Sequence, residues 1–463
     1  MSQIKTSSGS VVSWILRLIA LTFTVLLVSC GGDSPPPPWI GNKLMGAQGS
    51  ETYGNAVATD ASGNVYAVGY TDGGMDGNNL TGTQDSFLIK YNSSGEKQYT
   101  KQFGVQGKDT AAWGVATDGN GNVYVAGYTN GGLDGNTLTG IEDFFLIKYN
   151  SSGEKQYTKQ FGVQGKTTAA YSVATDTNGN VYVAGYTNGG LDGNTLTGTK
   201  DFFITKYNSS GEKQYTKQLG ATGFETQANA VATDITGNVY VTGYTNGGLD
   251  GNTKIGYQDV FLTKFSSIGE KQYTKQLGVK SVINAEVIKA VLFAEGMSVV
   301  TDKSGNVYVL GNLLAQGKDK SDGLDGNTMT GTHDFFLTKY DSSGEKQFTK
   351  QLGVQGVRTD AKSVTTDANG NVYIAGYTYG GLDGNTLTGN NDLFLTKYSS
   401  SGEKQFTKQM AGVEGKRTQA WGVTTDANGN VFVAGDTTGL AGETLTGTND
   451  FLLIKFDSSG VKQ

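Results

Sequence analysis

Thr117-Asp-Gly-Asn-Gly-Asn-Val-Tyr-Val-Ala-Gly-Tyr-Thr129 is the stretch that identifies the fold. It begins as a Gly- and Asn-rich turn and continues as a run of β-branched and aromatic residues, which is typical of a tight turn entering a β-strand. Similar phrases recur about every 60 residues. Their shared Asp stands at Asp60, Asp118, Asp176, Asp234, Asp302, Asp367 and Asp426. The chain is therefore a tandem array of seven similar units.

Each unit contains four short apolar runs separated by Gly and Asn. In the second unit they cover residues 113–118, 122–129, 143–149 and 154–162. Runs of this length, rich in Val, Tyr, Phe and Thr, predict β-strands, here called A to D in chain order. A repeat of this length with four strands is typical of a propeller blade. We therefore expect an all-β fold, a single seven-bladed β-propeller over residues 39–463.

The ends of the chain predict how the ring closes. The last unit reaches strand C near Phe456 without a strand D, and residues 39–46 align with the strand D at 99–104. We expect 39–46 to be the outer strand of the last blade, beside strands from 421–457. Mixing the first and last strands in one blade removes free sheet ends.

The repeat resembles a known family. Two phrases carry the resemblance, Thr-Asp-x-x-Gly-Asn-Val-Tyr-Val-x-Gly-Tyr-Thr at 117–129 and Asp-x-Phe-Leu-x-Lys-Tyr-x-x-x-Gly at 143–153. Both are similar to the repeat of the bacterial seven-bladed β-propeller repeat proteins. The resemblance covers 39–463 and implies the propeller fold, but it implies little about function.

The first 38 residues are typical of a targeting segment. The apolar stretch at 18–28 is too short to span a membrane and suits a signal peptide. It leads into Leu27-Val-Ser-Cys30, which is similar to a bacterial lipobox. That resemblance implies that residues 1–29 are a lipoprotein signal peptide and that Cys30 is lipidated. An ordinary secretory signal with an incidental Cys is the alternative.

All four prolines of the chain follow, at 35–38. A Pro run favours a semi-rigid extended spacer, so residues 30–38 are expected to be a lipidated stalk. Acyl chains hold a protein to a membrane by burying CH₂ groups. We therefore expect a lipid anchor at the outer membrane or cell surface of a bacterium.

Composition argues against several kinds of site. The chain has 1 His and 1 Cys in 463 residues, which excludes a two-His metal site, a Cys₄ zinc site and an internal disulfide. A net charge of −6 argues against a nucleic-acid partner. His333 occupies a position that varies between units, so we expect an exposed loop residue without triad partners. The sequence therefore predicts no catalytic residue and no metal site, and a protein that is not an enzyme.

Two repeated loop features are candidate binding residues. An Asp-Gly-Asn loop between strands B and C repeats one carboxylate in six units, and a Tyr ends strand B in five units. The candidates are Asp76, Asp134, Asp192, Asp250, Asp325, Asp383, Tyr70, Tyr128, Tyr186, Tyr244 and Tyr377. The Asp residues are expected to form turns without a cofactor, with calcium binding as the alternative. The Tyr residues are expected to pack between blades, with stacking on a sugar as the alternative.

The long B–C and D–A connections fall on one face of the predicted disc. Two insertions, at 280–296 and 312–322, enlarge these connections in the fifth unit. Because loops on rigid scaffolds carry function, we place the binding face there. Packing of the first insertion under the rim is the alternative.

The favoured function is a non-catalytic, lipid-anchored scaffold that binds a protein or matrix partner at the cell envelope. A carbohydrate-binding propeller is the alternative. A hydrolase or lyase that works with carboxylates is favoured least.

Overall fold

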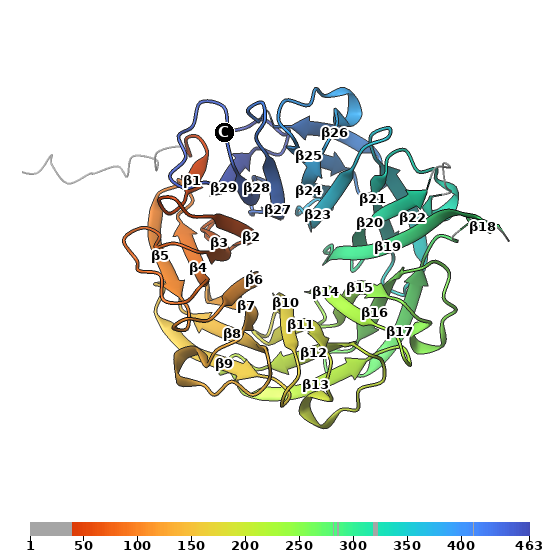
Figure 1. Cartoon of the computed structure of the whole chain (residues 1–463), viewed down its shortest axis with the longest axis horizontal. Helices are drawn as coiled ribbons and strands as arrows, with labels where there is room; N and C mark the ends of the chain where they lie inside the picture. Colours follow the sequence, from red (N-terminus) through yellow and green to blue (C-terminus); the bar gives the residue numbers. More distant parts are fainter. Residues whose placement is uncertain (1–38, 281, 285–286, 318–322, 411) are drawn as a thin grey trace, which may run out of the picture. The chain divides into compact units, whose positions relative to one another are not determined.

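The computed structural model describes residues 39–280, 282–284, 287–317, 323–410 and 412–463. Residues 40–463 form a ring of antiparallel sheets around a central channel (Figure 1). The predicted signal peptide, Cys30 and the Pro-rich stalk lie outside the described residues. In the described ranges, no helix has the length and apolar character that crossing a membrane requires.

The described residues form seven sheets, which we number as blades in chain order. Blade one consists of β2 (Thr52–Thr59), β3 (Val65–Thr71), β4 (Asp85–Tyr91) and β5 (Lys97–Phe103), from the channel outward. Blade two consists of β6 (Thr110–Thr117), β7 (Val123–Thr129), β8 (Asp143–Tyr149) and β9 (Lys155–Phe161). Blade three consists of β10 (Thr168–Thr175), β11 (Val181–Thr187), β12 (Asp201–Tyr207) and β13 (Lys213–Leu219). Blade four consists of β14 (Thr226–Thr233), β15 (Val239–Thr245), β16 (Asp259–Phe265) and β17 (Lys271–Leu277).

Blade six has four strands in the same order, and blade five has five, because a short additional strand comes first. They consist of β18 (Val282–Asn284), β19 (Val287–Thr301), β20 (Val307–Gly317), β21 (His333–Tyr340), β22 (Lys346–Leu352), β23 (Thr359–Thr366), β24 (Val372–Thr378), β25 (Asp392–Tyr398) and β26 (Lys404–Gln409). Short 3₁₀ turns lie in five B–C loops, at η1 (Leu133–Gly135), η2 (Leu191–Gly193), η3 (Leu249–Gly251), η4 (Leu324–Gly326) and η5 (Leu382–Gly384). The predicted all-β, seven-bladed propeller is confirmed.

The last blade closes the ring with the N-terminal strand. Its order is β1 (Lys43–Met45), β29 (Asp450–Phe456), β28 (Val431–Thr437) and β27 (Thr418–Thr425). Antiparallel pairing places Lys43 opposite Leu453 and Met45 opposite Phe451. The predicted closure is confirmed.

The repeated Asp phrase is a self-contained turn. Asp118 Oδ1 accepts hydrogen bonds from the backbone N–H groups of Asn120 and Asn122, both at 2.9 Å. Its Oδ2 accepts from Asn122 Nδ2 at 2.8 Å and from the Tyr124 hydroxyl at 2.9 Å. The turn at Gly121 has a φ of +74°, which glycine adopts without strain. One carboxylate thus shapes the A–B turn and pairs the hydroxyl of a fully buried Tyr.

The hydrophobic core lies between neighbouring blades. Strands β3 and β4 are buried along nearly their whole length, because each blade is covered on both faces. Tyr66 and Leu88 of blade one pack with Phe145 of blade two. Burying one such side chain stabilises the fold by about 1.5–3 kcal/mol.

A closed circle of threonines surrounds the channel. Thr117 Oγ1 donates to the carbonyl of Thr59 in the preceding blade, at 2.8 Å. Corresponding bonds join the other neighbouring blades, and Thr59 donates to Thr425 at 2.9 Å. The circle runs through Thr59, Thr117, Thr175, Thr233, Thr301, Thr366 and Thr425.

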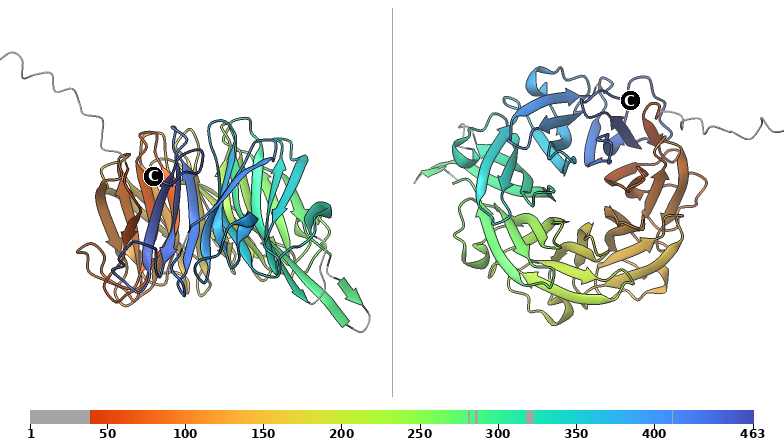
Figure 2. Two further views of the ribbon diagram at one scale, coloured as in Figure 1. Left: turned by 90° about the horizontal axis from the view of Figure 1, so that it is seen from above. Right: turned by 180° about the vertical axis from the view of Figure 1, so that it is seen from behind.

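The insertions of blade five form strands, so the prediction that they are loops is wrong. Ala290 pairs with Gly317 and Glu295 pairs with Asn312, which lengthens β19 and β20 together. Each insertion supplies the other with a pairing edge, so the two segments stabilise one another as a ribbon. Figure 2 shows the ribbon extending beyond the ring at β18 and the start of β19. Residues 318–322 of the second insertion lie outside the described residues.

Candidate functional site

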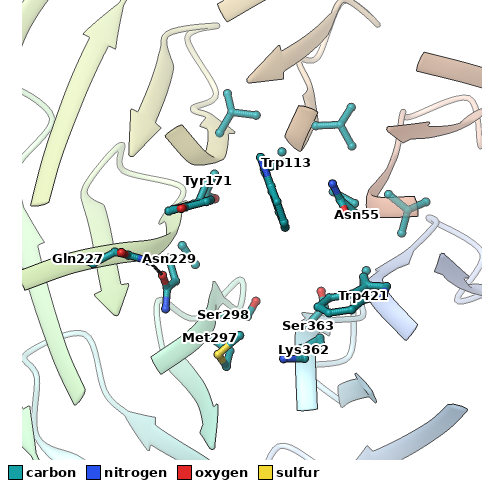
Figure 3. A pocket seen from close by; sticks show the side chains of 18 of the residues that line it. Asn55, Trp113, Tyr171, Gln227, Asn229, Met297, Ser298, Lys362, Ser363 and Trp421 are labelled. Carbon is teal, nitrogen blue, oxygen red and sulfur yellow. Dashed lines mark hydrogen bonds between the residues drawn. The ribbon is translucent and has the colours of Figure 1, made fainter. Parts of the chain in front are cut away.

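Every innermost strand carries a β-bulge. In blade two, the register shifts between Ala112 and Gly114 and leaves Trp113 without a partner on β7. A bulge redirects its side chain, and here the redirected side chains line the channel (Figure 3). The seven bulge residues are Asn55, Trp113, Tyr171, Asn229, Met297, Lys362 and Trp421.

The bulge residues surround a cavity of about 320 Å³, which we call the channel site. This volume suits a small ligand. The units are nearly identical just after the bulge, where most read Val-Ala-Thr-Asp or Val-Thr-Thr-Asp, but the bulge itself carries five residue types. The channel site is therefore asymmetric, although the ring around it repeats.

Aromatic rings form one wall of the channel site. The Trp113 and Tyr171 ring centroids lie 5.6 Å apart, edge to face. Three further ring pairs lie nearby. The ring centroids are 6.3 Å apart for Tyr70 and Trp113, 5.9 Å for Tyr186 and Tyr171, and 6.0 Å for Tyr377 and Trp421. Three of the strand-B tyrosines, Tyr70, Tyr186 and Tyr377, thus pack against residues that line the channel.

Charged groups also line the channel site. The Lys362 ammonium lies 5.0 Å from the Trp421 ring centroid and 5.6 Å from that of Tyr377. No ion pair joins Lys362 to a carboxylate among the described residues, and burial lowers its pKa. Glu295 accepts a hydrogen bond from Asn229 Nδ2 at 3.0 Å, and burial raises the pKa of its carboxyl.

A buried carboxyl holds Trp421 in place. Asp436 replaces the strand-B Tyr in blade seven, and its Oδ1 accepts from Trp421 Nε1 at 2.7 Å. Arg417 Nη2 lies 3.8 Å from the other carboxylate oxygen. Burial raises the pKa of Asp436 to about 6.

A second cavity, of about 270 Å³, lies where blades five and six meet. Glu295 and Lys362 line both this cavity and the channel site. His333 Nδ1 lies 3.0 Å from Asp360 Oδ1, and Arg358 Nε donates to Asp360 Oδ2. We call this the blade-five cavity.

The expectation that His333 is an exposed loop residue is wrong. The long β20 pairs Leu314 with His333, so β21 starts one residue earlier than its counterparts. The His333 side chain is 19% exposed, and that of Asp360 is 3% exposed. The counterparts of His333 in the other units are also half-buried or buried and bridge to the following blade, so this position of the blade places the single His of the chain in a cluster.

Six segments match the family described as a β-propeller repeat. They are residues 43–74, 98–134, 156–192, 214–250, 347–383 and 405–440. The chain is a β-propeller repeat protein. Most of blade five lies outside the matched segments. This blade holds the two insertions and the departures around His333.

Two curated proteins are similar to parts of this β-propeller repeat protein. Regulatory protein FlaEY of Caulobacter vibrioides is 27% identical over 195 residues, covering 38% of this chain and 20% of FlaEY. An uncharacterized WD repeat-containing protein of Acanthamoeba polyphaga mimivirus is 21% identical over 420 residues, covering 69% of this chain and 30% of that protein. The chain spans less than a third of the length of either relative.

Solved propellers are similar in fold. A polysaccharide lyase is 12% identical with a TM-score of 0.47, covering 92% of this chain and 93% of the lyase. An α-L-arabinofuranosidase from Fusarium graminearum is 9% identical with a TM-score of 0.38, covering 75% of this chain and 93% of the other. At such low identity these likenesses show the fold alone.

The prediction that the β-propeller repeat protein is not an enzyme is wrong as an inference from its composition. Propellers similar in fold include a polysaccharide lyase and an arabinofuranosidase. The prediction counted His and Cys, but a count does not show which titratable groups a ring brings together. The blade-five cavity combines an imidazole, two carboxyl groups and two cations from different strands.

The loop carboxylates lie away from both cavities. Asp134 Oδ1 pairs with Lys155 Nζ on the outer strand at 2.5 Å, and Asp76 pairs with Lys97 at 2.5 Å. Asp192, Asp250, Asp325 and Asp383 make the same pair with Lys213, Lys271, Lys346 and Lys404. All six Asp residues adopt a positive φ, which Asp tolerates in turns. Within the described ranges no three His, Cys, Asp or Glu residues gather as metal ligands, and calcium binding stays a prediction.

The strand-B tyrosines occupy half-buried positions, except for Tyr377, which is buried. Their place beside the bulge residues agrees with packing between blades, while their stacking on a sugar stays a prediction. The sequence reading missed the bulge residues. The signal that could have found them is the position five residues before each repeated Asp, which changes from unit to unit.

Proposed function

We propose that this β-propeller repeat protein binds a carbohydrate in the channel site. The observation that carries the proposal is the convergence of seven bulge side chains, of five residue types, on one cavity. Aromatic faces stack on the apolar faces of sugar rings. Asn55, Asn229 and Glu295 supply the amide and carboxyl groups that pair with hydroxyls. A site of this size favours a short saccharide over a folded protein.

The test is saccharide binding by the fragment 39–463. Trp113→Ala and Trp421→Ala are expected to weaken binding about fivefold or more, because each removes a stacking face worth about 1 kcal/mol or more. The measurement is a glycan array followed by titration calorimetry. Phe224→Ala is the matched control, since Phe224 is 46% exposed and does not line the channel site.

An array without any bound saccharide contradicts this function. Capture of a protein or matrix component that is indifferent to both Trp substitutions favours the protein-scaffold function instead. Equal loss of affinity with Phe224→Ala would place the saccharide outside the channel.

We also propose that Cys30 anchors the propeller to the bacterial envelope. The support is the lipobox-like Leu27-Val-Ser-Cys30, followed by the Pro run. The full chain expressed in bacteria is expected to incorporate a labelled fatty acid and to fractionate with membranes. Cys30→Ala is expected to abolish both. Labelling that persists in this variant contradicts the anchor.

A further inference from the structure

The departures of blades five and six from the repeat meet in the blade-five cavity. His333 stands where other units have Gln, Glu, Lys or Asn, and Asp360 stands where they have Tyr, Ala, Gln or Glu. Asn312 replaces the strand-B Tyr, and its amide exchanges two hydrogen bonds with the backbone of Ala361, at 2.9 and 3.0 Å. The smaller Asn leaves room that a Tyr ring would occupy.

His333 and Asp360 form an oriented dyad. The carboxylate binds Nδ1 of the imidazole, and Arg358 holds the second carboxylate oxygen. Nδ1 therefore carries the proton of the neutral ring, and Nε2 has no hydrogen-bond partner among the described residues. A buried carboxylate on Nδ1 is the arrangement that makes Nε2 a general base. Asp360 is a positioning residue in this arrangement.

Glu295 and Lys362 join the dyad to the channel site, because they line both cavities. Burial raises the pKa of Glu295, which favours the protonated carboxyl that a general acid requires. Lys362 presents an ammonium that no described carboxylate neutralises within ion-pair distance. A carboxylate on the ligand would complete that pair.

We propose that the blade-five cavity is a catalytic site that cleaves a uronic-acid-containing saccharide by β-elimination. This inference rests on the proposed function, because the saccharide bound in the channel site is the substrate. Three groups with different tasks are needed for this reaction, namely a cation, a base and an acid. Lys362, His333 and Glu295 supply them in that order.

The step balances without a further reactant. Lys362 pairs with the uronate carboxylate and stabilises the charge that develops when the α-carbon loses its proton. His333 Nε2 takes that proton, and the C–H electron pair forms a double bond to the neighbouring carbon. The bond from that carbon to the glycosidic oxygen breaks, and the oxygen takes the proton of the Glu295 carboxyl. Proton exchange with water then restores His333 and Glu295.

The experiment follows ultraviolet absorbance of the new double bond. The fragment 39–463 is incubated with polygalacturonate, alginate and hyaluronate, and with cello-oligosaccharide as a neutral control. Absorbance is expected to rise with at least one uronate polymer and not with the neutral one. Binding of the same saccharides is measured in parallel by calorimetry.

The repeat supplies matched variants that keep the fold. His333→Gln installs the residue of blades one and four, and Glu295→Gln installs that of blade four. His333→Gln is expected to lower the rate by about a hundredfold or more with binding retained. Glu295→Gln is expected to lower the rate by a similar factor and also to weaken binding, because its carboxyl pairs with saccharide hydroxyls in the channel site. Asp360→Ala, the residue of blades two and three, is expected to lower kcat and leave KM unchanged. Thermal melting checks that the variants fold.

The outcomes separate the two proposals. Uronate binding without an ultraviolet product overturns the elimination and leaves carbohydrate binding standing. A product formed equally by His333→Gln overturns the assignment of the base. A chain that binds none of these saccharides and forms no product overturns the elimination, and the glycan array then decides the proposed function separately.

Discussion

Asp436 has an environment unlike that of its counterparts, which are Tyr in five blades. Its carboxyl is fully buried, receives the indole N–H of Trp421 and faces Arg417. Burial disfavours the charged form more than Arg417 favours it, so the pKa rises to about 6. The ionisation of Asp436 therefore falls in the range where stability is measured.

Asp436→Asn tests this environment. The raised pKa means that the folded state binds the proton more tightly than the unfolded state does. Protonation of Asp436 therefore stabilises the folded state. This contribution is fully present below the ordinary Asp pKa of about 3.9 and is lost as pH rises through about 6. The unfolding free energy of the native chain is expected to fall by about 3 kcal/mol relative to the variant between pH 3.5 and pH 7. Urea unfolding at several pH values measures the difference.

Asp360→Asn is the control, because the contribution of Asp360 to the unfolding free energy is expected to change with pH in the opposite direction to that of Asp436. Hydrogen bonding from His333 and the charges of Lys362 and Arg358 outweigh burial and hold the pKa of Asp360 below its usual range. Its contribution to stability is present above the ordinary pKa and is lost as pH falls. Parallel pH curves for the native chain and both variants would contradict these assignments.

Single residues also show where prediction from sequence ends. The replacement of Tyr by Asn312 and Asp436 is visible in the repeats, but its consequence is not. The partners of Asn312 lie in blade six, and Arg417 and Trp421 meet Asp436 only because β27 and β28 pair. Such partners depend on register and on the neighbouring blade, which composition and spacing do not specify.

Among the elements, the A–B turn depends most on one side chain. Asp118→Ala is expected to destabilise the ring by about 1–3 kcal/mol, since it leaves the buried Tyr124 hydroxyl and two backbone N–H groups without their acceptor. Chemical denaturation measures the change. Asp118→Asn, which keeps one acceptor oxygen, is expected to lose less.

The strands themselves were largely predictable. The run at 143–149 is β8 as expected, and those at 122–129 and 154–162 differ from β7 and β9 by one residue at the ends. The predicted strand A at 113–118 begins three residues late, because β6 starts at Thr110. The bulge at Trp113 explains this error. It interrupts the alternation that marks a strand, and it also aims the side chain that forms the site.

For the ring as a whole, closure by β1 is the feature to test. A chain that begins at residue 47 lacks this strand and exposes the edge of β29. It is expected to melt at a lower temperature and to self-associate, because an unpaired edge recruits strands. Calorimetry and size-exclusion chromatography measure both effects. A chain that begins at residue 39 is the control and is expected to behave as a monomer.

The fold and its closure were predictable because both follow from the repeated unit, which occurs seven times and shows which strand is missing from the last copy. The channel site and the blade-five cavity were not, because each is made where the repeats differ. Their residues lie far apart in the sequence and meet only when the ring forms. This separation also explains why counting His and Cys failed to predict the chemistry.

The threonine circle bears on how such a gene can change. Tandem units this alike are prone to gain or lose a copy when they recombine. The circle has no end at which a unit could be added, since each hydroxyl bonds the blade before it and Thr59 bonds the last. A ring of six or eight blades would need another diameter and other bond directions at every junction. Gain or loss of a unit therefore changes the geometry at every junction of the circle, whereas a substitution within one unit leaves the other junctions unchanged.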